Sequence, residues 1–198
     1  MAADFAKLAE SLRSFYDFRD KVVLVVGAGG GQLFDPTVQP KKLIAIDPDP
    51  EALKQLEAKL AAVGRQNAVE YVAADFETVQ TSGDVVYFEF CLHEMFDPEQ
   101  ALAHARELAT DVVVFDHAPD SQWSFYAAED DKVHRSSEAL KPLMTRRCAA
   151  IRSEQRFKDY VELLVKLTPQ GPVATQRAER FAGATNIVIP MDCFLVLL

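Results

Sequence analysis

Residues 21–32, KVVLVVGAGGGQ, join a continuous run of branched aliphatic residues to a glycine-rich turn, which constrains the fold more than any other stretch of this sequence. The run at residues 22–26 is typical of a strand buried on both faces of a parallel sheet. Glycines let the turn approach a ligand closely, because no Cβ stands in the way. A second apolar run ends at Asp47, twenty residues after Gly27. An acid at that distance suits ribose hydroxyls, so the pattern predicts a site for an adenosine-containing cofactor.

Apolar runs and helix starts alternate along the first 120 residues. Asp49-Pro50 and Asp97-Pro98 each place a capping acid directly before a proline, as many helix starts do. Strands are expected at residues 22–26, 43–46, 69–73, 84–88 and 112–115, and helices at residues 4–17, 49–64 and 97–108. This alternation predicts an α/β fold of the three-layer, doubly wound type, with a mostly parallel sheet and helices on both faces. Ligands of such folds bind beyond the carboxyl ends of the strands.

The pattern after residue 120 is less regular. Residues 137–153 are expected to form a helix that Pro142 kinks or interrupts. Residues 157–167 fit both a helix and a strand, and we interpret them as a helix. Residues 172–181 predict another helix, and residues 186–198 are expected to supply the last strands of the sheet.

The length of 198 residues suits a single domain with a full core. We interpret residues 1–19 as an N-terminal helix or lid, residues 20–120 as the cofactor-binding core, and residues 121–198 as substrate-side helices and last strands. The net charge of −9 disfavours nucleic acid and anionic membrane as partners.

The three cysteines show no CxxC spacing and do not describe a disulfide framework, which favours a reducing compartment. No run of about 18 apolar residues predicts a transmembrane helix. The N-terminal residues carry acids and lack the apolar core of a signal peptide. A cytoplasmic location is therefore expected.

Two positions distinguish between the adenosine-containing cofactors. A dinucleotide fingerprint G-x-G-x-x-G would place glycine at position 32, where this chain has Gln32, and this disfavours a nicotinamide or flavin cofactor. Asp75 directly follows the third expected strand and precedes Phe76. Its carboxylate can accept from an adenine amino group while apolar neighbours hold the ring. The alternative for Asp75 is an acid that caps a loop.

The order of five motifs, VVLVVGAGGGQ, IAIDPDP, YVAADFE, DVVYFEFCLHEM and DVVVFDHAP, resembles the class I S-adenosylmethionine-dependent methyltransferases over residues 20–120. The resemblance is to the small-molecule branch, and it implies methyl transfer from S-adenosylmethionine to a small-molecule acceptor. It also implies a seven-stranded sheet whose last strand is antiparallel. A monomer or a homodimer is expected. Residues 121–198 depart from this pattern.

The resemblance implies a set of cofactor-binding residues. Gly27, Gly29 and Gly31 would wrap the methionine portion, Asp47 would hold the ribose, and Asp75 with Phe76 would hold the adenine. Three flanking positions complete the predicted set: Ala28, Pro48 and Phe90.

Candidates for a general base follow the fourth and fifth strands. His93 and Glu94 lie in the first of these loops, and Asp116 and His117 lie in the second. A histidine or carboxylate there can take a proton from the acceptor, and His117 is the first choice. The structural alternatives are a packing role for His93 and a loop-bracing or capping role for Asp116 and Glu94. These four residues have no ligand-like spacing, so no metal is predicted.

The aromatic run around Trp123 follows the fifth strand and is expected either to wall an acceptor pocket or to plug the core. Two other functions stay open. One is an NAD(P)-dependent reductase, against which Gln32 and the lack of a Tyr-x-x-x-Lys pair both speak. The other is a non-catalytic subunit that binds S-adenosylmethionine and serves a partner.

Overall fold

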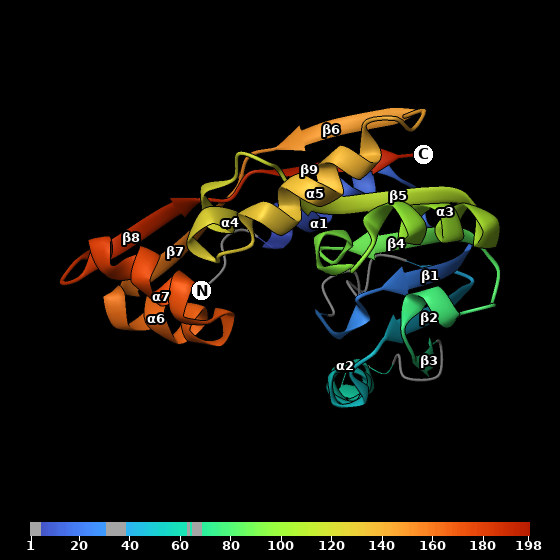
Figure 1. The fold of residues 1–198 in the computed structure, drawn as a ribbon. Coiled ribbons are helices and arrows are strands. Elements are labelled where there is room, and N and C mark those ends of the chain that lie inside the picture. The colour runs from blue at the N-terminus through green and yellow to red at the C-terminus, as the bar shows by residue number, and fades with distance from the viewer. Residues whose placement is uncertain (1–4, 31–38, 63, 65–68) are drawn as a thin grey trace.

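The structure is a computed structural model that describes residues 5–30, 39–62, 64 and 69–198 (Figure 1). The main sheet contains β1 (Val22–Val26), β2 (Lys42–Asp47), β3 (Val69–Ala73), β4 (Gly83–Glu89), β5 (Ala109–His117), β6 (Arg147–Ile151) and β9 (Cys193–Leu197). A second, two-stranded sheet contains β7 (Glu154–Asp159) and β8 (Thr185–Pro190). The helices are α1 (Phe5–Phe15), α2 (Pro50–Ala62), α3 (Pro98–Leu108), α4 (Gln122–Tyr126), α5 (Asp130–Leu140), α6 (Tyr160–Leu167) and α7 (Pro172–Ala178). The short 3-10 turns are η1 (Ala28–Gly30), η3 (Phe76–Thr78), η4 (Leu92–Glu94), η5 (Thr168–Gln170) and η6 (Glu179–Phe181).

The seven strands of the main sheet lie in the order β3-β2-β1-β4-β5-β9-β6. The pairs from β3 to β5 are all parallel, and β9 is antiparallel to both β5 and β6. The prediction of a mostly parallel, seven-stranded sheet with an antiparallel last strand is therefore confirmed.

The sheet is buried on both faces, as the continuous apolar run of β1 predicts. Val23 and Val25 point into the core on the face that α1 and α2 cover, while Leu24 and Val26 point into the core beneath α3 and α5. Figure 1 shows helices on both sides of the twisted sheet. This three-layer arrangement leaves the carboxyl ends of β1, β2 and β4 at one edge, where a ligand can reach them.

The two aspartate-proline helix starts form as expected. Oδ1 of Asp97 accepts a hydrogen bond from the backbone amide of Gln100 at 3.0 Å. Oδ1 of Asp49 accepts one from the amide of Glu51 at 2.9 Å. These caps satisfy amides in the first turns of α3 and α2, which would otherwise lack partners.

The helix expected at residues 137–153 is confirmed only over residues 137–140. The observed helix α5 begins earlier, at Asp130, and ends at Leu140, directly before the Lys141-Pro142 pair. A proline disfavours helical geometry at the residue before it, so the helix stops rather than kinks. Residues 147–151 instead form β6, an edge strand paired with β9.

Residues 152–192 form an arm that extends from the main sheet at the left of Figure 1. The ambiguous segment 157–167 is divided: β7 ends at Asp159, whose side chain accepts from the amide of Glu162 at 3.0 Å and starts α6. The expectation that residues 186–198 all join the main sheet is wrong in part. Strand β8 pairs with β7 in the arm, and β9 alone enters the main sheet.

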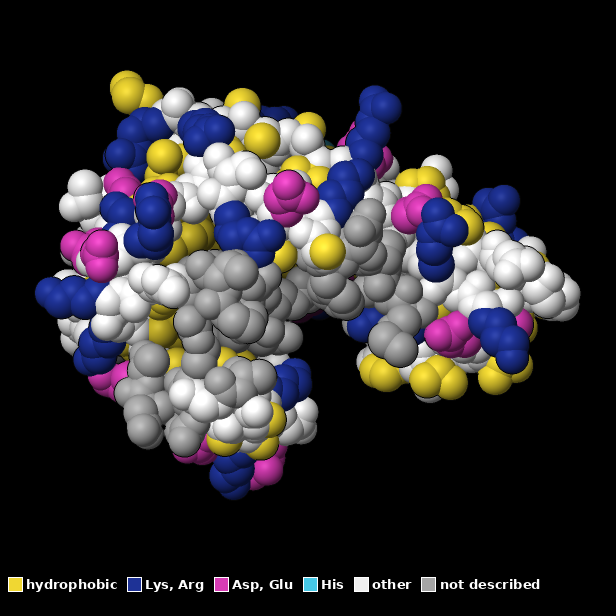
Figure 2. Space-filling model, turned by 180° about the vertical axis from the view of Figure 1, so that it is seen from behind, with side chains coloured by type: hydrophobic (Ala, Val, Ile, Leu, Met, Phe, Trp, Pro, Cys, Tyr) yellow, Lys and Arg dark blue, Asp and Glu magenta, His cyan; other side chains and the backbone are white. Residues whose placement is uncertain are grey.

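Helices in the described part of the chain are all too short or too polar to cross a membrane. The face drawn in Figure 2 carries Lys and Arg side chains interspersed with Asp and Glu, and the molecule is notched between the main body and the arm.

Candidate active site

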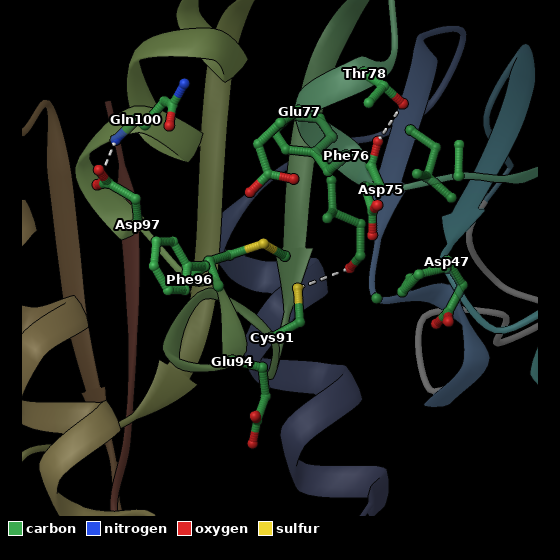
Figure 3. A pocket seen from close by; sticks show the side chains of 16 residues that line it. Asp47, Asp75, Phe76, Glu77, Thr78, Cys91, Glu94, Phe96, Asp97 and Gln100 are labelled. Carbon is green, nitrogen blue, oxygen red and sulfur yellow. Dashed lines mark hydrogen bonds between the residues drawn. The ribbon is translucent and has the colours of Figure 1, made fainter.

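A cavity of about 780 Å³ opens at the carboxyl ends of β1, β2 and β4, and η3, η4 and the start of α3 close its sides (Figure 3). Five residues predicted from the sequence line it: Gly27, Asp47, Pro48, Asp75 and Phe76. Glu94, predicted as a candidate base, lines it as well. The lining also includes residues that the sequence analysis did not single out for this site, among them Cys91, Met95, Phe96 and Gln100.

Asp47 is fixed in place by two backbone amides. Gly29 donates to Oδ2 at 2.8 Å, and Asp49 donates to Oδ1 at 2.9 Å. Each carboxylate oxygen has two lone-pair positions, so both oxygens can still accept bonds from a ligand in the cavity. The glycine turn and the acid thus form one unit, although 18 residues separate Gly29 from Asp47.

Gly27 adopts a positive φ of 72°, and a Cβ at this position would lie 2.5 Å from the Cβ of Cys91. The turn can therefore approach β4 only with glycine there. Sγ of Cys91 donates to the carbonyl of Val26 at 3.0 Å. Burial and the charge of Asp116 raise the pKa of the Cys91 thiol well above its ordinary value, so it is a packing residue rather than a nucleophile.

Asp75 precedes η3, but its side chain makes no cap hydrogen bond. The dashed bond in Figure 3 runs instead from the hydroxyl of Thr78 to the backbone carbonyl of Asp75, at 2.8 Å. Phe76 is buried, and its ring contacts Phe88 and His104 edge to face, with centroids 5.4 and 5.2 Å apart. The carboxylate of Asp75 therefore borders the cavity beside a fixed aromatic ring.

Three other predicted cofactor residues lie elsewhere. Ala28 is buried in the core and does not line the cavity. Phe90 lines a second cavity, described next, rather than the first. Gly31 lies outside the described residues.

The second cavity, of about 210 Å³, adjoins the first at Glu94, which lines both. Its walls come from the main body and from the arm. The main body supplies α1, Phe90, η4, the end of β5, α4 and the residue before α5, and the arm supplies β7, α6, η5 and the loop that precedes β9. The residues that line it are Leu8, Phe90, His93, Glu94, His117, Trp123, Glu129, Gln155, Lys166, Gln170 and Met191. Trp123 thus has the pocket-wall position that the sequence analysis considered.

Asp116 is fully buried and joins η4 to the end of β5, which extends through Asp116 and His117 rather than ending before them as expected. Its Oδ1 accepts from Nδ1 of His93 at 2.5 Å and from the amide of His117 at 2.8 Å, and its Oδ2 accepts from the amide of His93 at 3.0 Å. It lines neither cavity. The structure therefore favours the loop-bracing alternative for Asp116 over a role as base.

The charges around His93 oppose the effect of burial on its pKa. Burial alone lowers its pKa, but hydrogen bonds to Asp116 and Glu94 and the charge of Glu129 outweigh burial and raise the pKa to about 10. The bond to His93 and the contact with Lys132 lower the pKa of Glu94 to about 2. Burial raises the pKa of Glu129.

His117 differs from its neighbour. Burial, with the positive charge of His93, lowers its pKa to about 4 despite the charge of Asp116, so the ring is neutral at neutral pH. Its ring lies 5.5 Å from that of His93 and 5.0 Å from that of Phe90, centroid to centroid. Within the described chain, Nδ1 of His117 is buried with no hydrogen-bond partner.

Sequence reasoning missed most of the second cavity. Glu129 lies directly before α5, Gln155 lies in the arm, and Leu8 comes from α1. No motif marks these positions, because they meet only through the packing of α1 and the arm against the main sheet. The described lining of the larger cavity, in contrast, comes entirely from residues 26–100.

Comparison with known proteins agrees with this architecture. The family model of a methyltransferase domain matches residues 24–114. A sequence search of the curated proteins finds no match. Among solved structures, a candidate methyltransferase from Bacillus halodurans C-125 is 19% identical, with a TM-score of 0.67 and coverage of 98% of this chain and 97% of that chain.

Two further structures are similar over nearly the whole chain. A SAM-dependent methyltransferase from Aquifex aeolicus is 16% identical, with a TM-score of 0.59 and coverage of 99% of this chain and 89% of that chain. A magnesium protoporphyrin IX methyltransferase from Synechocystis PCC 6803, with bound SAH, is 12% identical, with a TM-score of 0.58 and coverage of 97% of this chain and 80% of that chain.

The family match, together with the sheet order, confirms the resemblance stated from the motifs: residues 24–114 are a class I methyltransferase domain, of the class that uses S-adenosylmethionine as methyl donor. The matched range contains every described residue that lines the larger cavity.

Proposed function

We propose that this protein transfers a methyl group from S-adenosylmethionine to a small molecule held in the cavity of about 210 Å³. The observation that carries the proposal is the meeting of the two cavities at Glu94. Methyl transfer is an in-line displacement that requires the donor carbon and the acceptor atom to approach to about 3–3.5 Å. Two adjoining cavities supply that arrangement, one for each reactant.

The larger cavity suits the donor in size and in chemistry. Its volume of about 780 Å³ falls within the range of roughly 300–1,000 Å³ for such ligands. Under this proposal Asp47 accepts from the ribose hydroxyls, Asp75 accepts from the adenine amino group, and Gly27 lies against the methionine portion. The SAH bound by the Synechocystis relative supports the same cofactor here.

The smaller cavity favours a compact acceptor. Its volume is below the range given above, and the net charge of −9 disfavours nucleic acid. His117 is the residue we propose as general base, since it lines this cavity and its Nδ1 has no partner within the described chain.

Calorimetry with SAH and a transfer assay with labelled S-adenosylmethionine test the proposal in two steps. We expect SAH to bind one site, and label to pass to a member of a panel of small hydroxyl, amine and thiol compounds. His117→Gln should lower kcat about 10²-fold or more without changing SAH affinity. A folded protein that does not bind SAH at high micromolar concentration would refute the proposal. Binding without transfer across a broad panel would instead favour the non-catalytic partner subunit.

A further inference from the structure

Three side chains at the edge of the smaller cavity bring ligand-type atoms together. Nε2 of His93, one carboxylate oxygen of Glu94 and one of Glu129 all lie within 4.8 Å of one another. Nε2 is 3.4 Å from Oε1 of Glu94 and 3.9 Å from Oε2 of Glu129. Bonds of about 2.0–2.2 Å in a tetrahedral site place ligand atoms roughly 3.3–3.6 Å apart. The contact between His93 and Glu94 has that spacing already. The contact between His93 and Glu129 is longer by about 0.3–0.6 Å, and the two carboxylate oxygens, which lie within 4.8 Å of each other, must also approach to bind one ion.

The neighbours of the cluster hold it in the orientation a metal site requires. The bond from Nδ1 of His93 to the buried Asp116, at 2.5 Å, fixes the ring and turns Nε2 toward the cavity. A carboxylate behind a histidine is the usual support of a metal-binding imidazole. Nζ of Lys132 donates to Oε2 of Glu94 at 2.6 Å, which leaves Oε1 for the cluster.

Unsatisfied polar atoms near the same cavity are an independent sign of a ligand. His117 and Gln155 are both more than nine-tenths buried and both line the cavity. Within the described chain, Nδ1 of His117 and Oε1 of Gln155 have no hydrogen-bond partner. Buried polar atoms are rarely left unpaired, so these two atoms in residues of the cavity wall require partners, which a bound molecule or an ordered water would supply.

We propose that Nε2 of His93, Oε1 of Glu94 and Oε2 of Glu129 bind one divalent transition-metal ion, Mn²⁺ or Zn²⁺, at the edge of the acceptor cavity. One imidazole with two carboxylates suits these ions better than Ca²⁺, which takes oxygen ligands alone. Three protein ligands leave at least one coordination position open toward the cavity. An oxygen atom of the acceptor that binds there is polarised by the ion, which eases loss of its proton.

The sequence predicts no metal, because His93, Glu94, Asp116 and His117 lack ligand-like spacing. In the structure Asp116 lies behind His93, and Glu129, the residue directly before α5, joins the cluster. Without an ion, a proton on Nε2 of His93 would hold the same carboxylates at the same distances. The ion and this proton compete for Nε2 of His93, and measured binding of a metal ion distinguishes the two possibilities.

The test is titration of the metal-stripped protein with MnCl₂, followed by electron paramagnetic resonance, and with ZnCl₂, followed by calorimetry. We expect one equivalent of ion to bind. Glu129→Gln should weaken binding at least tenfold, and Asp116→Asn should weaken it by about 10–100-fold. His134→Gln is the matched control, because it removes a surface histidine 3.7 Å from Glu138 and should leave binding unchanged.

Thermal unfolding of each variant checks that it is folded, and Glu94→Gln, on a partly exposed loop, serves in place of Glu129→Gln if that variant unfolds. No saturable binding of either ion, or binding that Glu129→Gln and Glu94→Gln leave unchanged, would overturn the proposal. Ion binding needs neither cofactor nor acceptor, so SAH calorimetry on the same samples separates this outcome from failure of the proposed methyl transfer.

Discussion

The backbone amide of Gly29 donates to Oδ2 of Asp47 across 2.8 Å, which joins the glycine turn after β1 to the acid that ends β2. The space around the Cα atom of Gly29 has no room for a side chain. A Cβ at position 29 would lie 2.6 Å from the Cβ of Ala52 and 2.8 Å from Oδ2 of Asp47. The position of Asp47, the residue predicted to bind the ribose, therefore depends on the absence of a side chain at Gly29.

Gly29→Ala should displace Asp47 and weaken SAH binding by about 1–3 kcal/mol, which is roughly 5–150-fold in affinity. Calorimetry measures this change. Gly83→Ala is the control, because a Cβ there would lie 2.8 Å from the carbonyl oxygen of Val22, at the opposite end of the sheet. That variant should lower the Tm without changing the affinity of the folded protein. Equal affinity losses in the two variants would show that the effect is general destabilisation.

Asp75→Ala should cost about 1–3 kcal/mol of cofactor affinity if its carboxylate accepts from the adenine amino group. An SAH analogue with hypoxanthine in place of adenine lacks that amino group, so the variant and the wild type should bind it equally well. Glu99→Ala, an exposed acid outside the cavity, should leave SAH affinity unchanged. If Asp75→Ala weakens the analogue as much as SAH, the carboxylate does not contact the amino group.

Asp111 should make the free energy of unfolding depend on pH under acidic conditions. The hydroxyl of Tyr16 donates to its Oδ2 at 2.5 Å and Arg146 donates to its Oδ1 at 2.7 Å. Burial raises the pKa of Asp111, but these bonds outweigh burial and hold it below the ordinary value of 3.8. The unfolded chain therefore takes up the proton first on acidification, and the free energy of unfolding falls as pH drops below about 5.

Denaturant unfolding between pH 3 and pH 7 should show a shallower acid limb for Asp111→Asn than for the wild type. Asp120→Asn, an exposed acid, is the control and should follow the wild-type slope. Tyr16→Phe should cost about 1–2 kcal/mol at pH 7, because one hydrogen bond to a charged group is lost while the ring stays. Parallel curves for Asp111→Asn and the wild type would mean that this carboxyl does not contribute.

Gln155 should be a site where stability and activity oppose each other. Its Nε2 contacts Sδ of Met191 at 3.0 Å, while its buried Oε1 is unpaired within the described chain. Gln155→Leu removes that polar group and should stabilise the protein by about 1–2 kcal/mol, with a Tm higher by a few degrees. The same change should raise the KM for the acceptor without affecting SAH binding. A lower Tm would instead indicate that an ordered water already satisfies Oε1.

The sequence predicted much of the lining of the larger cavity because its signals are local. A β-branched run, a glycine turn and an acid such as Asp47 follow one another along each βαβ unit, so spacing alone brings them to one edge of the sheet. Several residues that line the smaller cavity could not be predicted in this way. Glu129 and Gln155 reach the cavity through tertiary packing, which leaves no period or motif in the sequence.

The error at residues 137–153 has a similar cause. The segment RCAAI of β6 has little strand propensity of its own, and it becomes a strand because β9 offers an edge to pair with. Pro142 was a correct signal of a boundary, but it marks the end of a helix rather than a kink. Tertiary pairing, not local preference, decides the structure that follows.

The arm leaves the main sheet after Ile151 and returns at Cys193, and these two residues are directly paired in adjacent strands. The whole of residues 152–192 is thus inserted between two neighbouring points of the sheet, like a cassette with its ends side by side. Exchange of this cassette would change Gln155, Lys166, Gln170 and Met191 while the residues that line the larger cavity stay as they are. Under the proposed function, replacement of this single continuous segment would let one methyl donor serve new acceptors.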